Sequence, residues 1–145
     1  MTGTVEHFME LALTEGRKAI PLCGDNPPVG CLLVRGGEVV ACGHTNVPGA
    51  PHAEAMALQQ LAGNATEVTA FVTLEPCSFH GRTPSCAKAL IDAGVKKVYV
   101  AIMDPDPRNN GRGIALLREA GIAVEVGVLA AQAIADLQPY LGKAP

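Results

Sequence analysis

The stretch AFVTLEPCSFHGRTPSCAKALIDAGVKKVYVAIM, residues 70–103, decides the fold. It begins with a short apolar run, 70–74, and ends with another, 98–103, and both runs predict buried strands. Between them, Ser85 is a suitable N-cap for a helix that continues to Ala93, where Gly94 follows as the stop. A strand, a helix and a second strand in succession predict an α/β protein.

The rest of the chain continues this alternation. The expected helices cover residues 4–20, 52–61, 114–120 and 129–141, and the expected further strands cover 29–34, 39–42 and 122–126. The residues Arg-Gly-Gly-Glu at 35–38 join the first two strands as a β-hairpin. We therefore expect residues 1–145 to form one domain, a three-layer α/β/α sandwich around a mixed sheet of about five strands.

Composition and charge exclude several classes of function. The 145 residues are 48% hydrophobic and 17% charged, which is typical of a compact domain. The net charge is −3 and no basic run exceeds Lys96-Lys97, so we expect no long nucleic acid as a partner. No apolar run has membrane-spanning length, and the first residues do not resemble a secretory signal. Five cysteines, an odd number, favour free thiols and a cytoplasmic location.

Three residues have the pattern of a zinc site. His52, Cys77 and Cys86 supply one imidazole and two thiolates, and catalytic zinc sites use three protein ligands and leave the fourth position for water. Glu54, two residues after His52, can then move protons without binding the metal. The order His-x-Glu, Pro-Cys, Cys is typical of zinc-dependent nucleobase deaminases. The sequence predicts one Zn²⁺ per subunit and an aminohydrolase that acts on a cyclic amidine, with Glu54 as the catalytic acid and base.

Other interpretations of these residues remain open. His52 could merely cap a helix, with Glu54 on a solvated face and the cysteines in the core. A structural zinc site in a non-catalytic scaffold would need a fourth ligand, for which Cys23, Cys31 and Cys42 are candidates. Cys31 and Cys42 fall in apolar strands, which favours a role in the core, and a scaffold has no use for a free carboxylate beside the metal.

Residues 72–86, VTLEPCSFHGRTPSC, closely resemble the pyrimidine deaminase of riboflavin biosynthesis, a family of the cytidine deaminase-like superfamily. So do residues 26–31, 51–54, 104–107 and 111–113, and the resemblance covers about residues 8–126. It implies the cytidine deaminase-like fold, one zinc ion per site and the substrate diaminohydroxyphosphoribosylaminopyrimidine. It also implies a homo-oligomer, a dimer or higher. In that family the deaminase is often fused to a reductase, so we expect a separate reductase as a partner.

The same resemblance gives candidate substrate contacts in the loops, namely Asn26, Thr45, Phe79, His80, Arg82 and Asp106. The Asn26 amide can both donate and accept, which suits a pyrimidine edge, although an Asn-Pro turn can have only a backbone role. Phe79 could stack on a base or cover the core, and Arg82 could bind a phosphate through paired N–H groups. The Gly-Arg-Gly turn at 111–113 could cradle an anion or simply allow a tight helix entry.

Several of these loop residues depart from the usual family pattern. Thr45 and Phe79 stand where histidine is usual, Asp106 stands where asparagine is usual, and Asn109-Asn110 replaces an apolar stretch. These departures leave open a related deaminase that acts on another free base, nucleoside or specialised heterocyclic metabolite. A carboxylate at Asp106 that faced the pocket would favour a substrate without a phosphate.

Overall fold

The computed structural model describes residues 4–47, 50–78 and 85–141. Within these ranges the strands are β1 (Gly30–Arg35), β2 (Glu38–His44), β3 (Thr69–Leu74), β4 (Lys97–Ile102) and β5 (Ala123–Val126). The helices are α1 (Val5–Arg17), α2 (Ala53–Gln59), α3 (Cys86–Ala93), α4 (Arg112–Glu119) and α5 (Ala130–Leu137), and a short 3₁₀ turn, Gln138–Tyr140, follows α5. Each predicted helix and strand is confirmed, with shifts of a few residues at its ends.

The five strands form one mixed sheet in the order β2-β1-β3-β4-β5. β1 is antiparallel to both β2 and β3, whereas β3, β4 and β5 run parallel. As a result, the carboxyl ends of β2, β3 and β4 and the start of β1 lie at the same edge of the sheet, which we call the loop edge. In open α/β sheets, the carboxyl ends of strands are where ligands usually bind.

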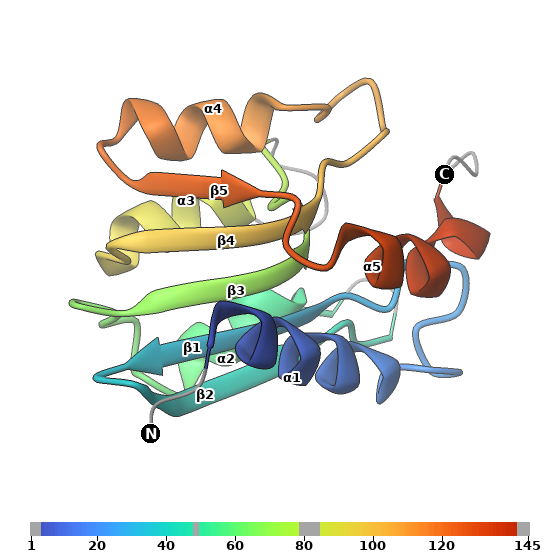
Figure 1. The fold of residues 1–145 in the computed structure, drawn as a ribbon, viewed down its shortest axis with the longest axis horizontal. Helices are drawn as coiled ribbons and strands as arrows, with labels where there is room; N and C mark the ends of the chain where they lie inside the picture. Colours follow the sequence, from blue (N-terminus) through green and yellow to red (C-terminus); the bar gives the residue numbers. More distant parts are fainter. Residues whose placement is uncertain (1–3, 48–49, 79–84, 142–145) are drawn as a thin grey trace.

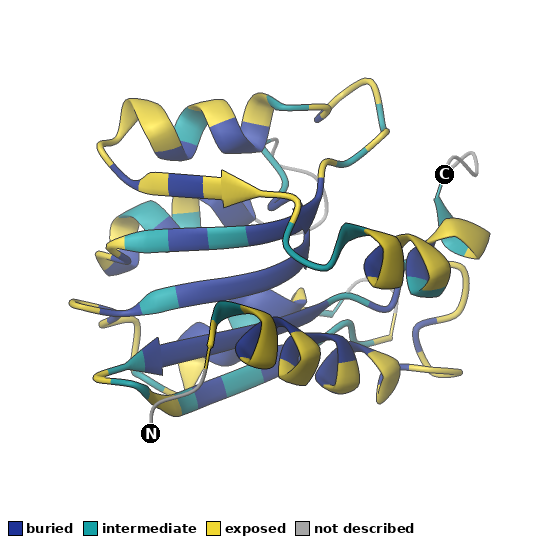
Figure 2. Cartoon of the chain, viewed as in Figure 1, coloured by how far each residue is buried: buried dark blue, intermediate teal, exposed yellow. Residues whose placement is uncertain are grey.

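Helices cover both faces of the sheet. In Figure 1, α1 and α5 lie in front of the sheet, and α2 and α3 lie behind it. Alternate residues of β1 face opposite layers, because Cys31 and Leu33 join the core under α2, α3 and α4, whereas Leu32 and Val34 join the core under α1 and α5. Figure 2 shows that the central strands β1 and β3 are largely buried, whereas β5 at the edge of the sheet and the outer faces of α1 and α5 are largely exposed. The predicted three-layer sandwich is confirmed.

Local sequence explains where the helices begin and end. The Ser85 hydroxyl accepts a hydrogen bond from the Lys88 N–H (3.2 Å), and Gly94 ends the same helix at φ 86°, as expected for a capped helix. The expected first helix, 4–20, ends at Arg17, and residues 18–20 continue as turns up to Pro21, which disfavours helical backbone at the residue before it. The last helix changes to a 3₁₀ turn where Pro139 removes a backbone donor.

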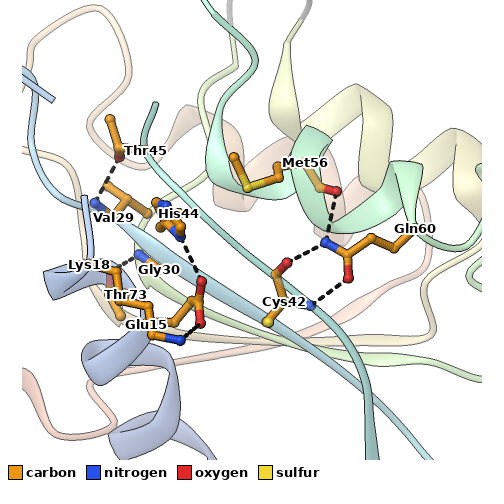
Figure 3. A network of polar contacts seen from close by, with 10 residues as sticks. All are labelled: Glu15, Lys18, Val29, Gly30, Cys42, His44, Thr45, Met56, Gln60 and Thr73. Atoms are coloured by element: carbon orange, nitrogen blue, oxygen red, sulfur yellow. Dashed lines mark hydrogen bonds and ion pairs between the residues drawn. The ribbon is translucent and has the colours of Figure 1, made fainter. Parts of the chain in front are cut away.

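Close backbone packing fixes the loop edge. A Cβ atom on Gly30, the first residue of β1, would lie 1.8 Å from the carbonyl oxygen of Ala12, so only glycine lets α1 lie directly on this strand. On the outer strand, the Gln60 amide binds both the N–H and the carbonyl of Cys42, which joins α2 to β2 (Figure 3).

Among the described residues, no helix is both long enough and apolar enough to cross a membrane.

Candidate active site

The loop edge brings His52, Cys77 and Cys86 together. His52 is the N-cap residue of α2, Cys77 follows the end of β3, and Cys86 is the first residue of α3. The ligand atoms of the three side chains all lie within 4.8 Å of one another, and His52 Nδ1 lies 3.2 Å from Cys86 Sγ. The start of α2 and the connection from β3 to α3 therefore bring the three residues into one compact group of donors.

This donor group fits a zinc ion. Tetrahedral zinc with ordinary Zn–S and Zn–N bonds places its ligand atoms about 3.5–3.8 Å apart, which this group reaches with little movement. Among the described residues, no fourth histidine, cysteine or carboxylate belongs to the group. Cys23, Cys31 and Cys42 are not part of it, and Cys23 and Cys31 are fully buried. Three ligands without a fourth are the composition of a catalytic rather than a structural zinc site.

The start of α3 stabilises a negative charge on Cys77. Its Sγ accepts a hydrogen bond from the Cys86 N–H (3.2 Å), and its carbonyl accepts from the Ser85 hydroxyl and the Ala87 N–H. Hydrogen bonding from the Cys86 side chain, together with His52, lowers the pKa of Cys77 to about 4. The same hydrogen bond to Cys77, followed by burial, raises the pKa of Cys86. Without metal, these contacts therefore favour a thiolate at Cys77 and a neutral thiol at Cys86.

Glu54 is a buried carboxyl group beside these ligands. It lies in the first turn of α2 and is only 4% exposed, so the alternative in which it occupies a solvated helix face is wrong. Burial, and then the negative charge on Cys77, raises the pKa of Glu54 to about 7. A carboxyl group that titrates near neutral pH can both accept and donate a proton, as a general acid and base must.

Thr45 and Asn26 lie in neighbouring loops at the same edge. The Thr45 hydroxyl donates to the Pro27 carbonyl (2.7 Å) and accepts from the Val29 N–H (2.9 Å; Figure 3). It thereby holds the segment that follows Asn26. Asn26 itself is exposed, and its side chain makes no hydrogen bond with any other described residue. The Asn26 amide is therefore available to a ligand, whereas the Thr45 hydroxyl is already used by the loop.

His44 does not replace the histidine that the family resemblance led us to expect at position 45. Its Nδ1 lies 2.6 Å from Oε2 of Glu15, a residue of α1 that also binds Lys18 (Figure 3). Burial alone would raise the pKa of Glu15, but hydrogen bonds from His44 and Lys18 outweigh it and lower this pKa. His44 is thus held by α1.

Asp106 is paired with a nearby arginine. Its Oδ2 lies 2.7 Å from Nη2 of Arg108, and its Oδ1 accepts from the Arg108 N–H (2.9 Å). The Arg108 guanidinium lowers the pKa of Asp106, so the carboxylate is ionised and its charge is matched. The remaining candidate contacts, Phe79, His80 and Arg82, lie outside the described residues.

Sequence reasoning missed two polar residues next to the ligands. Glu75 is 3% exposed and accepts hydrogen bonds from the N–H groups of Asp104, Gly111 and Ile114. Asn109 is fully buried and bonds to the backbone on either side of Cys77. Because Glu75 and Asn109 occupy the N–H groups at the start of α4, that helix does not offer the anion cradle considered from its Gly-Arg-Gly sequence. The sequence did offer one signal for Asn109, because Asn109 stands in a stretch that is usually apolar in the family that the chain resembles.

Comparisons with known proteins agree with this geometry. Residues 2–102 match the family described as the cytidine and deoxycytidylate deaminase zinc-binding region. The chain is 46% identical over 123 residues to the riboflavin biosynthesis protein RibD of Aquifex aeolicus, a match that covers 85% of this chain and 35% of that protein. It therefore spans about a third of the length of such curated relatives.

Solved structures give the same result. RibD of Acinetobacter baumannii superposes with a TM-score of 0.88 at 41% identity, over 92% of this chain and 37% of that one. A Thermotoga maritima protein, described as a diaminohydroxyphosphoribosylaminopyrimidine deaminase and 5-amino-6-(5-phosphoribosylamino)uracil reductase, superposes with a TM-score of 0.86 at 34% identity, over 93% and 39% of the two chains. The expected cytidine deaminase-like fold is confirmed.

Proposed function

Because the chain belongs to the cytidine and deoxycytidylate deaminase zinc-binding family, and is a zinc-dependent deaminase, we propose that its substrate is diaminohydroxyphosphoribosylaminopyrimidine. The products would be the corresponding pyrimidinone and ammonia, in riboflavin biosynthesis. The observation that carries this proposal is the convergence of His52, Cys77 and Cys86 beside the buried carboxyl group of Glu54. The names of the RibD relatives support the choice of substrate.

In the proposed mechanism, His52, Cys77 and Cys86 hold the metal, and zinc supplies Lewis acidity when it is bound there. Glu54 accepts a proton from the attacking water and delivers it to the ring nitrogen next to the carbon that carries the amino group. A second transfer through Glu54 protonates the departing amino group, so that ammonia leaves as the carbonyl forms. A pKa of about 7 for Glu54 suits both transfers, because the group must be a base first and an acid afterwards.

The candidate substrate contacts have different proposed roles. We propose that the exposed Asn26 amide contacts the substrate directly and that Thr45 contributes by holding the loop after Asn26. Asp106 would act through its ion pair with Arg108. Phe79, His80 and Arg82 are proposed from the family resemblance alone.

A hollow lined by two arginines supports a substrate that carries a phosphate. It has a volume of about 370 Å³, and its lining includes Ser78, the residue after Cys77. The rest of the lining comes from Arg108, Arg112, Ala115, Leu116 and Glu119. Guanidinium groups bind phosphate oxygens through paired N–H donors. The Asp106 carboxylate is matched by Arg108, so it does not present an uncompensated negative charge to such a substrate.

The cellular context is also proposed. None of the five cysteines, all of which lie in the described residues, forms a disulfide, which supports a reducing compartment such as the cytoplasm. The single sheet with a core on each face supports one deaminase domain over 1–145. We further propose a homo-oligomer and cooperation with a reductase, because the family resemblance implies both.

The test measures ammonia release by zinc-loaded protein from a panel of aminoheterocycles. The panel contains the phosphorylated substrate, its dephosphorylated form, cytosine nucleotides and aminopurines, with Glu54→Ala as the inactive variant and the exposed Glu10→Ala as the matched control. We expect the highest kcat/KM for the phosphorylated substrate, no turnover by Glu54→Ala and normal turnover by Glu10→Ala. Preference for another heterocycle would reject the substrate, and zinc binding without ammonia release from any compound would support the scaffold instead.

A further inference from the structure

We infer that Asn109 is a positioning residue that holds the backbone of Cys77 in the geometry needed to bind zinc. The inference rests on the proposed ligand set of His52, Cys77 and Cys86. Asn109 lies in the loop between β4 and α4, far from Cys77 in the sequence. A fully buried amide is costly unless it makes specific hydrogen bonds, so its partners indicate what it does.

The Asn109 side chain spans the ligand cysteine. Its Nδ2 donates to the carbonyl of Pro76, the residue before Cys77, at 3.2 Å. Its Oδ1 accepts from the N–H of Ser78, the residue after Cys77, at 3.1 Å. One planar amide thus fixes the peptide groups on both sides of the cysteine, and with them the direction of its Cα–Cβ bond.

The amide is itself held in a fixed orientation. Its Oδ1 also accepts from the Gly113 N–H (3.2 Å), and its Nδ2 also donates to Oδ2 of Asp104 (3.3 Å). These two contacts decide which end of the amide carries the oxygen, since a reversed side chain would place donors against donors. Asn109 therefore presents one specific pair of groups to the Cys77 backbone.

Glu75 and close packing fix the loop that carries Asn109. The carboxylate of Glu75 accepts from the N–H groups of Gly111 (2.9 Å) and Ile114 (3.0 Å), at the start of α4. A Cβ atom on Gly113 would lie 1.9 Å from the Pro76 carbonyl oxygen, so the helix start lies directly on the ligand segment. The position of Asn109 relative to Cys77 is therefore determined by several independent contacts.

The opposite side of Cys77 is held by α3. Its carbonyl accepts from Ser85 and Ala87, and its Sγ accepts from the N–H of Cys86, as described above. Cys77 thus lies between the starts of two helices, one that supplies a second ligand and one that supplies Asn109. Groups that orient a metal ligand typically change metal affinity by about 10–100-fold when they are removed.

The experiment compares zinc affinity in Asn109→Ala and Asn109→Asp with that in Asn110→Ala. Asn110 is the same residue type, adjacent and exposed, and therefore serves as the matched control. Affinity is measured by competition with a chromogenic chelator, and the cobalt-substituted proteins report thiolate coordination through their charge-transfer absorption. We expect both Asn109 variants to bind zinc about 10–100-fold more weakly than Asn110→Ala, with an altered cobalt spectrum.

Two outcomes separate this inference from the proposal on which it rests. If folded Asn109 variants keep the zinc affinity and the cobalt spectrum of the control, even with a lower unfolding midpoint, Asn109 is only a core residue and the inference is rejected. Asn109→Asp, which preserves the size and the acceptor oxygen, decides the question if Asn109→Ala does not fold. Cys77→Ser tests the ligand set separately, because normal zinc binding by that variant would reject the proposed ligands themselves.

Discussion

Replacing Glu54 with glutamine should abolish turnover. In the metal-free protein, the variant should also become more stable relative to the wild type as the pH rises. The substitution keeps the size of the side chain but removes the carboxylate that transfers protons. It also removes a buried ionisable group whose pKa is raised to about 7 by burial and by the charge on Cys77. The same environment that suits Glu54 to catalysis therefore makes its charged form unfavourable in the folded state.

The size and sign of the stability effect follow from the two pKa values. The pKa of Glu54 has its usual value of 4.5 in the unfolded chain and is about 7 in the folded protein. This difference contributes about 3 kcal/mol to the free energy of unfolding when the carboxyl group is protonated. Because the folded-state pKa is the higher one, this stability is fully present below the unfolded value of 4.5 and is lost as the pH rises through about 7. Glutamine does not titrate, so the free energy of unfolding of the variant does not show the decrease with pH that Glu54 causes in the wild type.

The assay is urea unfolding of metal-free wild type and Glu54→Gln at a series of pH values from about 4 to about 8. The free energy of unfolding of the variant minus that of the wild type should rise by about 3 kcal/mol over this range, with most of the change between the two pKa values. In parallel, zinc-loaded Glu54→Gln should release no ammonia. A difference in unfolding free energy that does not depend on pH would refute the raised pKa of Glu54 and the reasoning that assigns it both proton transfers.

Three further predictions concern the metal and its surroundings. Cys86→Ser should lose stoichiometric zinc by metal analysis, whereas Cys42→Ser, outside the donor group, should retain it; equal zinc content in both would reject the ligand assignment. Zinc binding at pH 8 should release at least one proton, from Cys86, because Cys77 is already a thiolate. Calorimetry in buffers of different ionisation enthalpy measures the number of protons released, and zinc binding without proton release would contradict the prediction. Gly113→Ala should lower the free energy of unfolding by about 1–3 kcal/mol, because its Cβ atom meets the Pro76 carbonyl; an unchanged denaturation midpoint would refute this close approach.

The sequence predicted most of the fold because its local signals agree with the tertiary structure. Ser85 and Gly94 mark both ends of α3, and the apolar runs of β3 and β4 are bounded by turn residues. Helix ends differed where proline was decisive, as before Pro21 and at Pro139. These local rules do not specify strand order, so the sheet order β2-β1-β3-β4-β5 had to come from the structure.

The candidate site was less completely predictable. His52, Cys77, Cys86 and Glu54 could be identified because metal and proton chemistry restrict residue type and spacing. Burial of Glu54 was not visible in the sequence, since a carboxylate two residues after an N-cap is compatible with either a solvated or a buried helix face.

The loops show why residue type alone is a poor guide to substrate contacts. The hydroxyl of Thr45 is used by its own loop, and the carboxylate of Asp106 is used by Arg108. Asn109, conversely, looked like a loop substitution and is a buried bridge across Cys77. Such roles depend on contacts between β3 and the loop after β4, which no local pattern records.

The most direct test of the central claim follows oxygen from solvent into product. Zinc-loaded protein is incubated with diaminohydroxyphosphoribosylaminopyrimidine in ¹⁸O-labelled water, and the product is analysed by mass spectrometry alongside ammonia release. We predict one labelled oxygen per ammonia released, located at the ring carbon that lost its amino group, and neither product with Glu54→Gln. Ammonia release without incorporation of label, or unchanged incorporation by Glu54→Gln, would contradict hydrolytic deamination by Glu54 at this site.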